Sequence, residues 1–178
     1  MKNLQVIIVL VISTSLMRLL PHAPNFTPVI ALAIFSGAMI PNKSLAVALT
    51  LAAMFLSDLF LGLHSTMTVV YVSLILIVLL SSLLQKTSLL ADRKLSLKSL
   101  ASLLGFSVFS SLVFFLFTNF GVWVLQDMYP KTMSGLMLCY VAALPFLNAT
   151  ITSTVFYSVV LFAVCFRFES KQAKLQTC

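Results

Sequence analysis

Long apolar runs, separated by short polar or proline-containing segments, occupy almost the whole chain. Runs such as VVYVSLILIVLLSSLL (69–84) do not alternate between apolar and polar positions, whereas strands of a membrane barrel alternate over about ten residues. Backbone groups in lipid must find their hydrogen-bond partners within the protein, so only helices and closed barrels cross a membrane. The pattern therefore predicts membrane-spanning helices.

Six runs approach the length of about 20 mainly apolar residues that a span needs. The second run is short, so it is expected to tilt little, to thin the bilayer locally or to stop short of a full crossing. The last run is long enough to overshoot the bilayer or to bend at Pro145. Together they predict one bundle over residues 1–178, with helices at about 3–20, 26–41, 44–63, 66–85, 98–125 and 133–166.

The composition supports an integral membrane protein. Of the 178 residues, 61% are hydrophobic and only 8% are charged, whereas soluble domains carry about 25% charged residues. The first run follows Lys2 as a signal peptide would, but Arg18 closes it and no small-x-small cleavage site follows. We therefore expect this run to remain as a helix.

Basic residues lie at the ends of the apolar runs, and this placement predicts the orientation. The net charge is +7, which in a soluble protein would suggest a nucleic-acid partner, but here it fits the positive-inside rule. With the N-terminus inside, only Arg18 and Lys131 are outside, which favours both termini in the cytoplasm and an even number of spans. The nine inner cations are Lys2, Lys43, Lys86, Arg93, Lys94, Lys98, Arg167, Lys171 and Lys174.

One acid, Asp58, stands within the apolar segment AAMFLSDLFLGLH (52–64). It is fourteen residues beyond Ser44, about 21 Å along a helix axis and so about a third of the way in from the outer face. A carboxylate there is costly and requires a partner, and Arg18 lies at a similar depth. Two interpretations remain open: an ion pair that only holds the first and third helices together, or one that also borders a ligand pocket.

Further polar residues gather near the predicted outer ends of the helices. Asn119 and Trp123 are four residues apart and share one helix face; an indole and amides around a cavity suit a small, polar, planar ligand. For Trp123, ordinary anchoring at the membrane interface is the alternative. The candidate ligand-binding residues are Arg18, His22, Asn25, Asp58, His64, Asn119, Trp123, Tyr129 and Asn148.

The sequence offers little support for a metal, a cofactor or catalysis. The spacing of the two histidines and Asp58 matches no metal site. Ser57 and His64 are seven residues apart and could share a helix face, but no nucleophile motif surrounds the serine and no paired carboxylates are present. No Walker motif occurs, so any ATP-driven step depends on a partner. We expect no enzyme, no bound cofactor and no nucleic-acid partner.

Two pairs of small residues at four-residue spacing allow close helix approach. Ala33 and Gly37 lie in the second predicted helix, and Ala48 and Ala52 lie in the third. Such pairs either pack helices within one bundle or form a docking face for another membrane protein.

Four segments resemble an uncharacterised family of bacterial membrane proteins that is grouped with the substrate-binding S components of energy-coupling factor (ECF) vitamin transporters. The segments are RLLPHAPNFTPVIALAIFSGA (18–38), LSDLFLG (56–62), TNFGVWV (118–124) and YPKTMSGLMLCYVAALPFLNAT (129–150). The resemblance implies an all-α, six-helix S-component-like bundle of the bacterial cytoplasmic membrane, with both termini in the cytoplasm. It also implies a vitamin or metabolite pocket near the outer face.

The same resemblance implies a membrane coupling subunit driven by two ATPases. Many S components carry an alanine-x-x-x-alanine motif on their first helix for this contact. The first helix here has none, so any docking face is expected on the second or third helix. The favoured function is uptake of a small metabolite or vitamin, and the alternative is a non-transporting membrane scaffold or assembly subunit.

Overall fold

The computed structural model describes residues 2–21, 23–86 and 95–176, and within these ranges all regular structure is helical. His22, Arg93 and Lys94, which were singled out in the sequence, lie outside these ranges. The elements in chain order are α1 (Lys2–Leu16), η1 (Met17–Leu19), α2 (Val29–Met39), α3 (Lys43–Leu61), α4 (Met67–Ser81), η2 (Ser82–Lys86), α6 (Leu97–Leu125) and α7 (Met133–Gln176).

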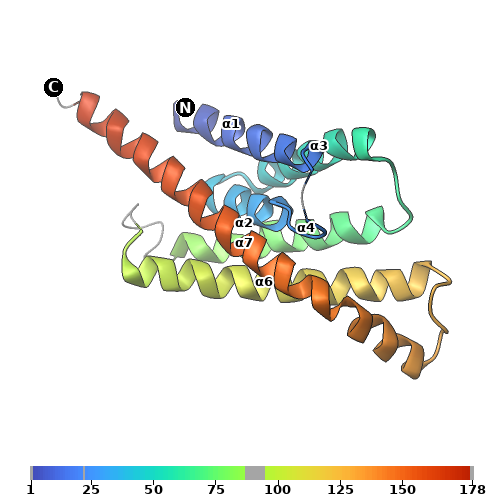
Figure 1. Cartoon of the computed structure of the whole chain (residues 1–178). Helices are drawn as coiled ribbons and strands as arrows, with labels where there is room; N and C mark the ends of the chain where they lie inside the picture. The colour runs from blue at the N-terminus through green and yellow to red at the C-terminus, as the bar shows by residue number, and fades with distance from the viewer. Residues whose placement is uncertain (1, 22, 87–94, 177–178) are drawn as a thin grey trace.

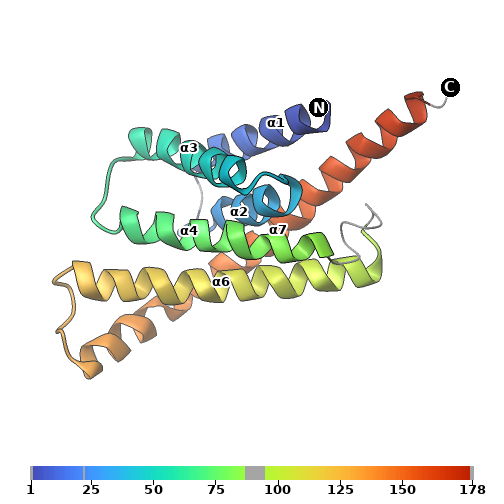
Figure 2. The same cartoon turned by 180° about the vertical axis from the view of Figure 1, so that it is seen from behind.

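Consecutive long helices run back and forth along the bundle (Figure 1). As a result, the start of α1 and the end of α7 lie at the same end, which we call the terminal end (Figures 1 and 2). The α3–α4 and α6–α7 connections lie at the opposite end, the loop end (Figure 2). Helix α7 crosses the other helices obliquely and extends past them at the terminal end (Figure 1).

Prolines set the limits of η1 and α2. A residue that precedes proline is driven out of the helical conformation by a clash with the proline ring. Leu20 precedes Pro21 and is extended after η1, and Ile40 precedes Pro41 and is extended after α2. Helix α2 begins only after Pro28, so it is shorter at both ends than the predicted 26–41.

Helix α2 forms the centre of the bundle. All eleven of its residues are buried, and it contacts α1, α3, α4, α6 and α7. A helix that is apolar on every side is expected to be surrounded by protein. Phe35 packs edge-on against Phe162 of α7, with ring centroids 5.3 Å apart. Ser36, its one hydroxyl residue, bonds to Thr50 of α3 at 2.6 Å.

The C-terminal carbonyls of α2 are satisfied by side chains of neighbouring segments. The last turn of a helix leaves carbonyl groups without a helical partner. Lys43 donates to the carbonyl oxygens of Gly37 and Ile40, at 3.0 and 3.3 Å. Gln85 donates to the Ala38 carbonyl oxygen at 3.2 Å. These bonds allow a helix of about 16 Å, too short to cross a hydrocarbon core of about 30 Å, to end inside the bundle.

Four helices in the described ranges are long and apolar enough to cross a membrane, which is fewer than the six spans predicted. They cover Lys43–Leu61, Met67–Gln85, Leu97–Leu125 and Met133–Lys171. The apolar parts of the first two helices, Ile7–Leu19 and Val29–Met39, are shorter.

Helix α7 begins at Met133 as predicted but ends at Gln176, whereas the sequence predicted an end near residue 166. The prediction followed hydropathy, which falls at Arg167. The added segment RFESKQAKLQ is rich in residues with high helix propensity, so the helix continues after the apolar run has ended.

Gly37 tests the central packing. A methyl group at this position would collide with the Val78 carbonyl of α4 and lie 2.9 Å from the Ser81 Cβ. We expect Gly37→Ala to lower the free energy of unfolding by about 1–3 kcal/mol because the backbones must move apart. Thermal unfolding of the detergent-purified protein measures the loss.

Gly105→Ala is the matched control. It adds the same methyl group on α6 where nothing lies within 4 Å, so helix propensity alone acts and stabilises by about 0.5–1 kcal/mol. Equal unfolding temperatures for the two variants would contradict the close approach of α2 and α4.

Candidate ligand-binding site

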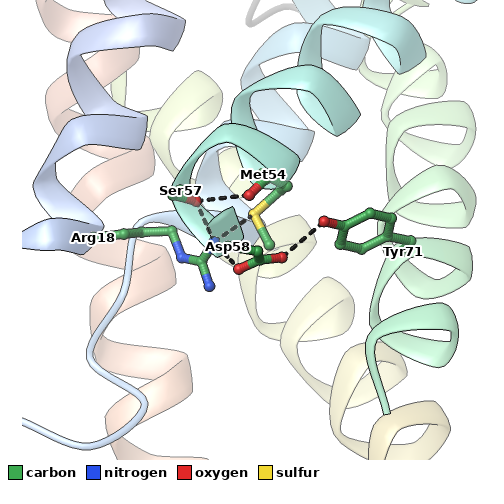
Figure 3. A network of polar contacts seen from close by, with 5 residues as sticks. All are labelled: Arg18, Met54, Ser57, Asp58 and Tyr71. Atoms are coloured by element: carbon green, nitrogen blue, oxygen red, sulfur yellow. Dashed lines mark hydrogen bonds and ion pairs between the residues drawn. The ribbon is translucent and has the colours of Figure 1, made fainter. Parts of the chain in front are cut away.

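A buried ion pair connects three elements near the loop end. Arg18 of η1 contacts Asp58 of α3, with the Nη1 and Oδ1 atoms 2.8 Å apart and side-chain exposures of 14% and 2%. The second carboxylate oxygen of Asp58 accepts a hydrogen bond from the Tyr71 hydroxyl of α4, also at 2.8 Å (Figure 3). Both oxygens are therefore satisfied, and the Arg18–Asp58 pair expected from the sequence is present.

Two further residues of α3 complete the surroundings of the Arg18 Nη1 group. The Arg18 Nη1 group also donates to the Ser57 hydroxyl and lies 3.5 Å from the Met54 sulfur. Ser57 donates its own proton to the Met54 carbonyl oxygen at 2.8 Å. One terminal nitrogen of Arg18 thus makes all these contacts, and no dashed contact reaches the other in Figure 3.

A cavity of about 320 Å³ lies beside this ion pair. Its walls come from η1, the segment before α2, α2, α3, the α3–α4 connection, α4, α6 and α7. Its lining residues are Arg18, Asn25, Thr27, Val29, Ile30, Met54, His64, Val70, Phe114, Thr118, Asn119, Val122, Thr150 and Ser153. This volume is in the range of small-molecule sites, which combine an apolar lining with a few polar groups.

Hydroxyl groups on α6 and α7 give the cavity hydrogen-bond acceptors. Thr118 donates its proton to the Phe114 carbonyl at 2.8 Å, and Thr150 donates to the Phe146 carbonyl at 2.9 Å. Ser153 likewise donates to the Thr150 carbonyl at 3.0 Å. Because these protons are bound to the helix backbone, the lone pairs of the hydroxyl oxygens remain for a ligand.

Two asparagines lie at the same cavity. Asn119 donates one amide proton to the Phe115 carbonyl at 2.8 Å, which leaves its carbonyl oxygen and second amide proton for other partners. Asn25 has a positive φ of 60°, a conformation that asparagine adopts more readily than most residues. The backbone carbonyl oxygen of Asn25 lies 3.5 Å from the Ser153 hydroxyl, so the segment before α2 approaches α7 there.

The structure brings only some of the predicted ligand-binding residues together. Arg18, Asn25, His64 and Asn119 line the cavity, and Asp58 lies behind Arg18 without lining it. His22 lies outside the described residues.

The other three candidates do not line the cavity. Trp123 donates its indole N–H to the Pro130 carbonyl at 2.9 Å, so it holds the connection between α6 and α7. Tyr129 lies half-buried in that connection, and Asn148 is exposed on α7. The cavity instead contacts the α7 face that carries Thr150 and Ser153.

Tyr71, Thr150 and Ser153 were missed in the sequence. Thr150 is two positions from Asn148, which is about 200° around a helix, so the two side chains lie on opposite faces of α7. The available signal was the three-residue spacing of Thr150 and Ser153, which puts both hydroxyls on one face.

The two small-residue pairs are in different environments. Ala33 and Gly37 are buried in the core, and Gly37 faces α4. Ala48 and Ala52 are exposed on α3. Only the second pair is therefore accessible to another protein. No group of three or more His, Cys, Asp or Glu side chains positioned to hold a metal ion occurs in the described ranges.

The helical fold and its long apolar helices define the chain as a helical membrane protein. A family model described as "Family of unknown function (DUF6580)" matches residues 1–175. The chain therefore belongs to this family. The comparisons with curated proteins and with solved structures gave no match.

Tyr71→Phe tests the ion-pair network. The change leaves one oxygen of the buried Asp58 carboxylate without its donor, so we expect a loss of about 1–3 kcal/mol in the free energy of unfolding. The control is Tyr140→Phe, which removes a hydroxyl that donates to the neutral Leu116 carbonyl at 2.8 Å. Thermal unfolding should show the larger loss for Tyr71→Phe; an equal or smaller loss would mean that Asp58 does not depend on Tyr71.

Proposed function

We propose that the chain is an S-component-like membrane protein that binds a small metabolite or vitamin for uptake, together with a separate energising module. The observation that carries this proposal is the cavity of about 320 Å³ near the loop end, which six helical elements line and where polar side chains from η1, α6, α7 and the connecting segments converge. A bundle that served only as a scaffold has no need of such a cavity beside a buried ion pair.

The proposal includes six passes across the bacterial cytoplasmic membrane, with both termini in the cytoplasm. The described cations support this orientation. The start of α3 at Lys43, the start of α6 next to Lys98 and the end of α7 after Arg167 all lie at the terminal end (Figures 1 and 2). Arg18 and Lys131 lie toward the loop end. By the positive-inside rule, the terminal end is cytoplasmic and the cavity opens toward the exterior.

A coupling partner would dock on α3. Ala48 and Ala52 are exposed one turn apart on this helix, and small residues permit the close approach that helices use in membranes. Ala33 and Gly37 are buried and have no such role.

Single-cysteine labelling tests the orientation. In a variant without native cysteines, Ser65→Cys and Thr132→Cys place thiols on exposed connections at the loop end, and Lys171→Cys places one near the end of α7. We expect a membrane-impermeant maleimide to label the first two in intact cells and the third only after lysis. Labelling of the thiol at position 171 in intact cells would overturn the orientation.

A ligand screen tests the binding function. The purified protein is screened by thermal shift against vitamins and small metabolites, and the affinity for the compound found is measured by calorimetry. We expect Asn119→Ala to weaken binding about tenfold or more, the equivalent of one hydrogen bond of about 1.4 kcal/mol. Asn148→Ala, which changes an exposed asparagine outside the cavity, is the control and should leave affinity unchanged. A screen without any ligand, or equal effects of the two variants, would contradict the proposal.

A further inference from the structure

Arg18 contacts its described neighbours in α3 through one terminal nitrogen of its guanidinium group. All of the contacts described above, to Asp58, Ser57 and Met54, are made by Nη1. Among the residues drawn in Figure 3, none contacts the other terminal nitrogen, and Arg18 lines the cavity. A guanidinium group carries five N–H donors in a planar fork, so a second edge remains for an acceptor on the side opposite Asp58.

The charges around the cavity favour an acceptor that is itself an anion. Among the lining residues, the ionisable side chains are Arg18 and His64, and no carboxylate lines the wall. Asp58 lies behind the arginine with only 2% of its side chain exposed, so it offers little surface to a ligand. A cationic group in the cavity would therefore face basic side chains. An anion would form charge-assisted hydrogen bonds, which are about twice as strong as neutral ones.

The remaining lining residues indicate the chemistry of the rest of the ligand, which we call its body. Apolar side chains from four helices, Val29, Ile30, Met54, Val70, Phe114 and Val122, form much of the wall. The hydroxyl oxygens of Thr118, Thr150 and Ser153 act as acceptors because their protons bind backbone carbonyls. A body with an apolar face and a hydroxyl or N–H donor complements both parts.

We infer that the cavity binds a small organic acid, whose carboxylate pairs with the edge of Arg18 opposite Asp58 and whose donor group faces the hydroxyls of α6 and α7. The inference rests on the proposed function and specifies the chemical class of its ligand. It assigns Arg18 two simultaneous roles: one nitrogen holds α3, and the remaining edge recognises the acid.

Matched probes test this inference. Three series are built on benzoate, 4-hydroxybenzoate and mandelate, and each contains the acid, its primary amide and the corresponding amine. Calorimetry and thermal shift on the detergent-purified full chain measure binding. We expect at least one acid to bind at least tenfold more tightly than its amide and amine. Failure of all three acids to bind, or equal binding of an amide or amine, would overturn the inference. The two proposals can fail separately. An uncharged or cationic ligand found in the metabolite screen would overturn this inference but leave the proposed function intact.

Arg18→Lys tests the role of the fork. Lysine keeps a cation beside Asp58 but replaces the planar fork by a single point charge, so we expect acid binding to weaken at least tenfold. Unchanged affinity would overturn the assignment of Arg18. If Arg18→Lys does not fold, the double variant R18Q/D58N provides the test, because it removes both charges of the pair together. We expect it to abolish the preference for acid over amide. Retention of that preference would equally overturn the assignment.

Thr118→Val tests the acceptor side without changing the ion pair. It preserves the shape of the side chain and removes the hydroxyl. We expect it to weaken 4-hydroxybenzoate severalfold while leaving benzoate, which lacks the donor group, unchanged. Equal effects on both acids would mean that the ligand body does not face this hydroxyl.

Discussion

The cost of burying polar groups in an apolar bundle is the constraint on which the rest of the structure depends, because a buried charge or hydrogen-bonding group is stabilised only when another group of the chain pairs with it. The Asp58 carboxylate meets this requirement with one hydrogen bond from Arg18 and one from Tyr71, each 2.8 Å long. Removing either donor would leave a buried acceptor unsatisfied. The Lys43 and Gln85 side chains meet the same requirement for the carbonyls at the end of α2.

The same constraint explains why the candidate site lies where it does. The ion pair attaches η1 to α3 and, through Tyr71, to α4. The cavity forms beside it, with the segment before α2, α6 and α7 completing its walls. Polar side chains are costly in an apolar bundle, and the four on α6 and α7 that line the cavity each donate to a backbone carbonyl of their own helix. The few polar groups that stabilise the bundle near the cavity are thus also the groups available to a ligand.

Much of the fold follows from the sequence, and part of the site does. Hydropathy located all the main helices, and the scarcity of charge made Arg18 the evident partner of Asp58. Tyr71 was missed because a tyrosine in an apolar run is equally typical of core packing. The sequence predicts Asn148 as a binding residue, but only packing decides which face of α7 turns inward, and that face carries Thr150. Hydropathy also cannot distinguish a helix that spans from α2, whose eleven residues are buried by neighbouring helices.

Helix α2 runs without interruption from the cavity to the segments that hold its C-terminal end. Val29 and Ile30 in its first turn line the cavity, while the carbonyls of its last turn are held by Lys43 and Gln85. An α-helix resists compression along its axis because each turn is hydrogen-bonded to the next. A displacement of the first turn of α2 at the cavity would therefore also move its last turn, about 16 Å away, where Lys43 and Gln85 hold its carbonyls.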